Sequence, residues 1–180
     1  MTRRTAVKWL HWLSFALLLY FFVDEPEIGG PGLGILRAAE LEFHAGMGLI
    51  LALLTLVWYL IYKKGGPLGR PGPKLPAWGK KAHGYLNNGL YFALPVMVAT
   101  GGLAGLVADF PVRGFGVIPL NIPALGWEQL HDAAEEVHEL AFDGLTILII
   151  AHAAFHIWRH IRLRDNALRI MSPKALHRYL

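Results

Sequence analysis

Apolar residues gather in four long runs, separated by segments rich in charge, glycine and proline. Each run is roughly 17 to 24 residues long, the length that a helix needs to cross the hydrocarbon of a bilayer. A helix also satisfies its own backbone hydrogen bonds, as the bilayer requires. The runs therefore predict an all-α, transmembrane four-helix bundle, in one integral-membrane domain over residues 1–180. The expected helices are Val7–Val23, Phe43–Tyr62, Tyr85–Val107 and Val137–Trp158.

The edges of the runs carry further signals. Ile35–Glu42 contains no helix breaker, so the second helix is expected to begin near Ile35, and an amphipathic stretch from Trp127 leads into the fourth helix. Pro95 and the pair Gly101–Gly102 predict a kink or a close helix contact in the third helix. Glycine and proline predict irregular connections at Asp24–Gly34, Gly65–Pro76 and Ala108–Gly126.

Lysine and arginine are distributed unevenly over the polar segments. They gather in the two terminal segments and between the second and third runs, whereas the other two connections hold only Arg37 and Arg113. Cytoplasmic segments of membrane proteins carry the excess of positive charge, so both termini and the middle connection are expected to be cytoplasmic. The basic residues on that side are Arg3, Arg4, Lys8, Lys63, Lys64, Arg70, Lys74, Lys80, Lys81, Arg159, Arg162, Arg164, Arg169, Lys174 and Arg178.

Most acidic residues fall on the opposite, outer side and give it a negative potential. The formal net charge of +4 therefore does not indicate nucleic acid, because the basic segments are expected to face anionic lipid. The amphipathic tail Asp165–Leu180 is expected to rest on the inner leaflet. The outer acids are Asp24, Glu25, Glu27, Glu40, Glu42, Asp109, Glu128, Asp132, Glu135 and Glu136.

Five of the nine histidines lie within the apolar runs, and four of them form two sets at matching depth. His138 and His152 are fourteen residues apart on one expected helix, so they share nearly one face and are separated by about 21 Å along its axis. In the predicted topology His11 and His152 lie near the inner surface, and His44 and His138 lie near the outer surface. A single such histidine is often a polar interfacial residue, but two pairs at matching depths favour function, because buried ionisable groups are costly in a membrane.

Two neutral imidazoles on facing helices can hold a haem iron from both sides and leave no position open for dioxygen. The pattern therefore predicts two haems, each between one histidine pair, and electron transfer rather than oxygen chemistry. The chain has no cysteine, which excludes covalent c-type attachment and leaves non-covalent haem b. Gly46, Gly48 and Gly144 lie near the expected ligands and make room either for a porphyrin or for close helix packing.

Two further histidines, His156 and His160, continue the face of His152. His156 is an alternative partner for His11, although His152 fits the depth of the membrane core better. Both residues are candidates to lie near haem propionates, quinone or lipid headgroups, or to be plain interfacial residues. Candidates to neutralise propionates of the inner haem, or else ordinary flanking charges, are Lys8, Lys81, Arg159 and Arg162.

The remaining polar residues of the helices have weaker signals. Asp143 is a candidate to orient a histidine ligand or to move protons near a quinone, and otherwise a shallow residue reached by water. His83 opens the third helix on the inner side, where a plain interfacial role is at least as well supported as a functional one. His131 lies one heptad before His138 and is expected to be solvated.

Taken in order, several short motifs resemble those of the bacterial cytochrome b561 family. They are Leu10–His11–Trp12, His44 with Gly48, Leu94–Pro95, His138–Glu139, His152–Ala153–Ala154, His160 and the run Asp165–Pro173. The resemblance covers nearly the whole chain, and the ordered set carries it rather than any one motif. It implies a dihaem b-type protein of the bacterial inner membrane that uses the same four histidines and exchanges electrons with ubiquinone. His83 lies about one residue from the usual position of the family's third-helix histidine.

Several functions stay open at this point. The first is electron transfer between a quinone and an outer partner, for which the acidic outer face favours a basic soluble protein such as a cytochrome c-like one. The second is a haem-bearing membrane anchor of a larger dehydrogenase or hydrogenase-type complex. Some family members resemble superoxide oxidases with a basic outer face, and the acidic face here would repel superoxide. A transporter is disfavoured because no broken helix or central ion site is evident.

Overall fold

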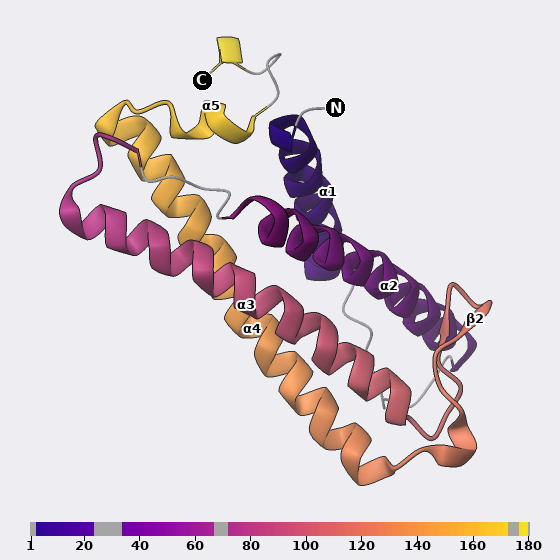
Figure 1. The fold of residues 1–180 in the computed structure, drawn as a ribbon. Helices are drawn as coiled ribbons and strands as arrows, with labels where there is room; N and C mark the ends of the chain where they lie inside the picture. Colours follow the sequence, from indigo (N-terminus) through magenta and orange to yellow (C-terminus); the bar gives the residue numbers. More distant parts are fainter. Residues whose placement is uncertain (1–2, 24–33, 67–71, 173–176, 180) are drawn as a thin grey trace.

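Four long helices form the described part of the molecule (Figure 1). The computed structural model describes residues 3–23, 34–66, 72–172 and 177–179. Each long helix contains a segment long and apolar enough to cross a membrane, so the predicted transmembrane four-helix bundle is confirmed. The helices are α1 (Arg3–Val23), α2 (Gly34–Gly65), α3 (Ala77–Val107) and α4 (Glu128–Trp158).

The helices extend beyond the apolar runs that predicted them. α2 begins at Gly34 and α4 at Glu128, as the absence of breakers indicated. α3 begins directly after Pro76, well before its apolar run, and continues through Pro95 to Val107. The reason is that hydropathy marks only the part of a helix in contact with hydrocarbon, whereas the helix itself continues until the backbone is interrupted.

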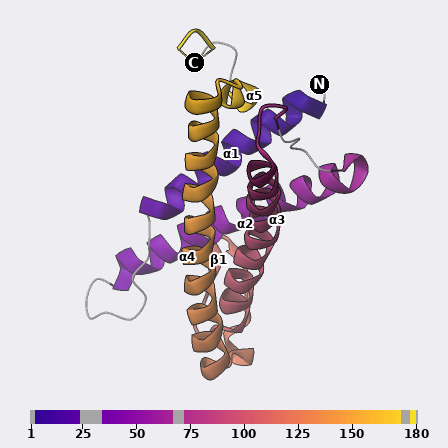
Figure 2. The same ribbon diagram turned by 90° about the vertical axis from the view of Figure 1, so that its left-hand side faces the viewer.

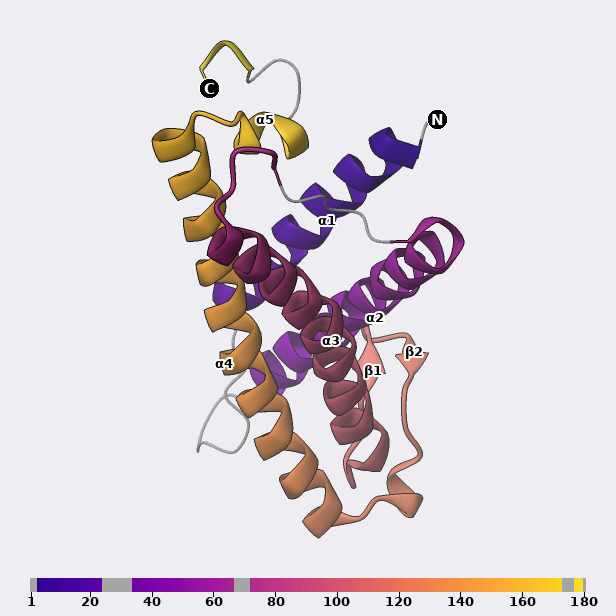
Figure 3. The same cartoon turned by 60° about the vertical axis from the view of Figure 1, so that its left-hand side comes forward.

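α3 and α4 run antiparallel and side by side, while α1 and α2 cross them at an angle (Figures 2 and 3). Large apolar side chains such as Phe92 and Ile147 are 76% and 68% exposed, as expected of a surface in contact with lipid tails. All four helices contribute to a small buried core, whose members are Leu17, Leu18, Phe21, Leu51, Met97 and Leu145.

One end of the bundle, which we call the hairpin end, contains residues 108–131 and the start of α2. This connection is more ordered than its glycine and proline content indicated. The Asn121 side chain donates to the carbonyl oxygens of Ala108 and Phe110 and accepts from the Val112 N–H, all within 2.9 Å. Its elements are β1 (Arg113–Gly114), β2 (Ile118–Pro119), antiparallel to β1, and the 3₁₀ turn η1 (Pro123–Leu125).

The opposite end, which we call the tail end, contains the start of α1, the end of α4 and residues 159–172. After α4 the chain forms the π-helical turn η2 (Arg159–Leu163) and the short helix α5 (Ala167–Met171). Trp12 Nε1 donates to the Met171 carbonyl at 2.9 Å, and Lys8 Nζ donates to the Ser172 carbonyl at 3.1 Å. The first part of the tail therefore packs on α1 rather than standing apart.

α1 begins and α4 ends at the tail end, as four crossings require (Figure 1). Which side of the membrane this end faces stays a prediction from the basic residues. The expected loop at residues 24–33, part of the connection at 67–71, and the tail at 173–176 lie outside the described residues.

Candidate haem-binding sites

The structure brings His44 of α2 and His138 of α4 together at the hairpin end. Their ring centroids are 6.5 Å apart, and the ring planes lie at 86° to each other. A metal atom bonded to one nitrogen of each ring would place the centroids about 6 Å apart, because a metal–imidazole bond is about 2 Å long. The spacing of the two rings therefore fits one shared iron without a large movement of either helix.

Groups of α3 hold the His138 ring in one orientation. Its Nδ1 lies 3.2 Å from the Met97 carbonyl oxygen and 3.2 Å from Oγ1 of Thr100. An Nδ1–H that donates to Met97 leaves Nε2 as the nitrogen with a free lone pair, the arrangement typical of metal-ligating histidines. A Cβ at Gly101 would lie 2.6 Å from Cε1 of His138. The glycine pair Gly101–Gly102 predicted a kink or a close helix contact. At Gly101 the structure shows a close contact, and its partner is the candidate ligand His138.

Aromatic side chains cover the other member of this pair. The Phe21 ring lies edge-on to His44, with centroids 4.9 Å apart. Phe115, at the tip of the hairpin, has a left-handed backbone with φ of 53° and places its ring against α2. A Cβ at Gly46 would lie 2.5 Å from that ring. Gly46 therefore makes room for the hairpin, which neither interpretation of this glycine had anticipated.

At the tail end, His152 of α4 lies within electrostatic range of His11 of α1. Nδ1 of both rings is buried and makes no hydrogen bond to the described residues. Since buried polar nitrogens are rarely left unpaired, these two require a further group or a water molecule. Whether His152 or His156 pairs with His11 stays a prediction.

Two more histidines surround this tail-end pair. The His156 ring centroid lies 4.5 Å from that of His152 and 5.7 Å from that of His83. His83 is 5% exposed, and its ring nitrogens lie 3.3 and 3.5 Å from Nδ2 of Asn87. His83 is therefore part of the packed surroundings of the tail-end pair instead of an exposed interfacial residue.

Two glycines leave open space beside the candidate ligands. Gly48 lies one turn after His44, and Gly144 lies between His138 and His152 on α4. No described atom approaches within 4 Å of a Cβ built at Gly48 or Gly144. Space beside the backbone suits a flat ring system such as a porphyrin. The pair of imidazoles at the hairpin end, and the buried tail-end nitrogens without a hydrogen bond to the described residues, point the same way. The residues present therefore fit haem.

Arg159, a candidate for a haem propionate, already has a partner within the chain. Its Nε and Nη2 donate to Oδ2 of Asp165 at 2.9 and 2.7 Å, and the two side chains are 1% and 2% exposed. A Cβ at Gly72 would lie 2.5 Å from Nη2 of Arg159, so the absence of a side chain at this position leaves room for the pair. Contact of Arg159 with a propionate stays a prediction.

The other candidate residues lie apart from the two pairs. His160 lies in η2 and is half-buried, and Asp143 is exposed, with no hydrogen bond to a histidine among the described residues. The expectation that His131 is solvated is wrong: it is buried, and its Nδ1 lies 2.9 Å from the Ala104 carbonyl oxygen. The exposed basic candidates are Lys81 and Arg162, whereas Lys8 binds the tail as described above.

Sequence reasoning missed three contributors to these sites. Thr100 and the Met97 carbonyl orient His138, and Asp165 neutralises Arg159. The only sequence signal for the first two was the adjacent glycine pair. Asp165 appeared only inside a motif of the tail, and nothing in the sequence paired it with an arginine across the turn that separates them.

Four membrane-spanning helices that bring histidines together in pairs are typical of the membrane cytochromes. A family model described as prokaryotic cytochrome b561 matches residues 3–174 of this chain. The chain belongs to the prokaryotic cytochrome b561 family. It is accordingly a multi-pass membrane protein of the haem b electron-transfer type. No curated protein matches the chain in a sequence search.

Proposed function

We propose that this chain holds two haem b groups, one at each end of the bundle, and transfers electrons between a quinone and a partner on the outer side of the bacterial inner membrane. The observation that carries the proposal is that His44 and His138, from different helices, meet at the hairpin end. At the tail end, His11 and His152 each have a buried Nδ1 without a hydrogen bond to the described residues. α4 supplies one member of each pair, about 21 Å apart along its axis, so it connects the two levels.

At the hairpin end, the chain's own residues prepare a rigid site. His44 and His138 would hold the haem iron between them, and a pair of imidazole ligands would leave no position for dioxygen. The Met97 carbonyl keeps the His138 proton on Nδ1, so Nε2 would be the nitrogen that binds the iron. The Phe21 ring packs edge-on against His44. Bound haem supplies one-electron transfer between ferric and ferrous iron.

At the tail end, His11 and His152 are the proposed ligands, and Gly144 contributes the space beside α4. We place quinone chemistry near this end as well, because oxidation of a quinol releases two protons with its two electrons. The imidazoles of His83 and His156 lie beside His152 near the end of α4 and are suited to accept protons. Arg159 and His160 remain the proposed contacts for propionates or for the quinone headgroup.

A second function, a haem-bearing anchor of a larger dehydrogenase or hydrogenase-type complex, is favoured by one feature of the hairpin end. Val117, Ile122 and Leu125 are all more than 60% exposed there. Exposed apolar side chains bordered by acids such as Asp109 and Glu128 are common where a protein partner docks. In this alternative the electrons come from that partner instead of from a small soluble carrier.

The test uses the purified chain in detergent. The reduced spectrum and the haem-to-protein ratio should show b-type haem at about two per chain, reducible by a ubiquinol analogue. Quinol-dependent reduction that requires a co-purifying subunit would favour the anchor function. A haem-free protein, isolated with ample haem supply, would overturn both. Superoxide oxidation at low ionic strength is expected to be slow because the outer face is acidic, and fast turnover would contradict that expectation.

A further inference from the structure

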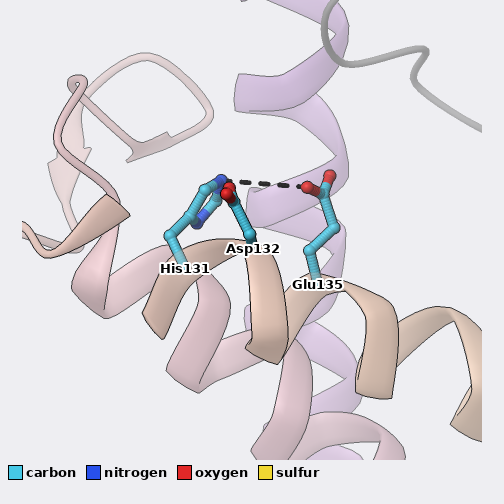
Figure 4. Close-up of side chains that lie close together, drawn as sticks. All are labelled: His131, Asp132 and Glu135. Atoms are coloured by element: carbon cyan, nitrogen blue, oxygen red, sulfur yellow. Dashed lines mark ion pairs between the residues drawn. The ribbon is translucent and has the colours of Figure 1, made fainter. Parts of the chain in front are cut away.

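The first two turns of α4 carry a cluster that electron transfer does not use. His131, Asp132 and Glu135 present one imidazole nitrogen and two carboxylates whose ligand atoms all lie within 4.8 Å of one another. Figure 4 shows the His131 and Glu135 side chains directed toward each other above the helix, with Asp132 beside them. We propose that these three residues form a binding site for a divalent transition-metal ion of the zinc type.

The hydrogen bond at the other nitrogen of His131 prepares this ring for a metal. Nδ1 lies 2.9 Å from the carbonyl oxygen of Ala104. Ala104 is in the last turn of α3, where carbonyls lack partners within their own helix, so an Nδ1–H donates to it. Nε2 then carries the lone pair. A histidine whose Nδ1–H binds a backbone carbonyl is the usual arrangement at a metal centre.

His131 is buried although it is polar, and its Nε2 is directed into the cluster. The residue is 9% exposed, and the Phe110 ring packs against it edge-on with centroids 5.2 Å apart. Nε2 lies 4.0 Å from Oε2 of Glu135, which is too long for a hydrogen bond. With the proton on Nδ1, a lone pair faces a carboxylate across this gap, and the contact is favourable only if a cation lies between them. Ligands of one zinc ion are typically about 3–4 Å apart.

The donor set also selects the class of ion. An imidazole nitrogen with carboxylates suits zinc and neighbouring transition metals, whereas magnesium and calcium prefer oxygen alone. The two carboxylates balance the charge of a divalent ion. Glu135 is half-buried and Asp132 is exposed, so water can complete the coordination. Three protein ligands with an open position are common at zinc sites that exchange a ligand.

A simpler interpretation is an ion pair between a protonated His131 and Glu135, without any metal. The test is calorimetric titration of the tag-free, full-length chain with Zn²⁺ after chelator treatment. We expect one saturable site, and Glu135→Gln and His131→Gln should each weaken binding at least about tenfold. Glu136→Gln removes the same charge from the next residue, which lies outside the cluster, and should leave binding unchanged. X-ray absorption of the zinc-loaded protein should show one imidazole among oxygen ligands at about 2 Å.

Because His131 is buried, thermal unfolding of each variant accompanies the titration. Glu135 is partly exposed and its replacement by glutamine is isosteric, so this variant keeps the test valid if His131→Gln misfolds. Absence of saturable binding would overturn the site in favour of the ion pair. Equal weakening by Glu136→Gln would also overturn it, because it would indicate diffuse attraction to an acidic surface. None of these measurements depends on haem content or quinone chemistry.

Discussion

The two ends of the bundle hold their histidines in different ways. At the hairpin end, His138 is oriented by the Met97 carbonyl and Thr100, and Phe115 and Phe21 pack around the turn of α2 that carries His44. At the tail end, Nδ1 of His11 and of His152 is buried and has no hydrogen-bond partner among the described residues. The neighbours there are other imidazoles, whose proton positions are adjustable.

Because His138 already has a fixed orientation, we expect the proposed hairpin-end site to be organised before haem binds, and the proposed tail-end site to be completed by the group that it binds. A preorganised site loses less entropy on binding. We therefore expect the hairpin-end haem to be held more tightly, and the tail-end haem to be the first one lost on dilution or mild denaturation. Because the neighbours of the tail-end pair are imidazoles, we also expect proton transfer to take place at that end.

The largest effect should follow removal of a ligand from one end at a time. We expect His44→Leu to lose the hairpin-end haem and His11→Leu to lose the tail-end haem, each leaving about one haem per chain. Haem-to-protein ratios and low-temperature spectra measure this, and His177→Leu, in the tail, is the control. Loss of both haems in either variant would contradict the assignment of the histidines to two separate sites.

The next largest effect concerns the stability of the tail end. Arg159→Met leaves the Asp165 carboxylate buried without its partner, and breaking such a pair costs about 3–5 kcal/mol. The melting temperature in detergent should therefore fall clearly. Haem should be lost from the tail end before it is lost from the hairpin end. Arg162→Met, in the same turn but exposed, is the control. Equal melting temperatures for these two variants would show that the buried pair has no structural role.

A smaller effect should follow from a single methyl group at the hairpin end. Gly101→Ala places a Cβ 2.6 Å from the His138 ring, and such overpacking costs about 1–3 kcal/mol. The displaced ring should weaken haem binding and alter the potential of that haem alone. Gly102→Ala meets open space and should stabilise α3 slightly through helix propensity. Redox titration of the two variants distinguishes them, and identical titrations would contradict the contact.

The smallest expected effect concerns one hydroxyl. Thr100→Val removes an oxygen 3.2 Å from Nδ1 of His138, a contact worth about 1 kcal/mol. The midpoint potential of the hairpin-end haem should shift slightly, while haem content stays the same. Thr55→Val is the matched control, because the one bond of Thr55 Oγ1 within the described residues goes to the Leu51 carbonyl of its own helix. A shift of the same size in Thr55→Val would exclude a specific role for Thr100.

Much of the architecture was predictable because membrane crossing imposes a length and a hydropathy that a chain displays openly. The four runs became α1 to α4, and the absence of breakers correctly placed the starts of α2 and α4. The proximity of His44 to His138 followed from helix periodicity combined with the topology expected from basic residues. These properties depend on residue type and spacing along one helix, so no contact between helices had to be known.

The sequence thus determined the class of fold and the number of crossings, and it predicted which histidines share a depth. Only the tertiary structure decided that Asp165 neutralises Arg159, that Gly46 receives Phe115, and that His131 is buried against Ala104. Each of these contacts joins different elements, or passes across a break in a helix. Their partners depend on helix rotation and on the path of a connection, and local periodicity carries no information about either.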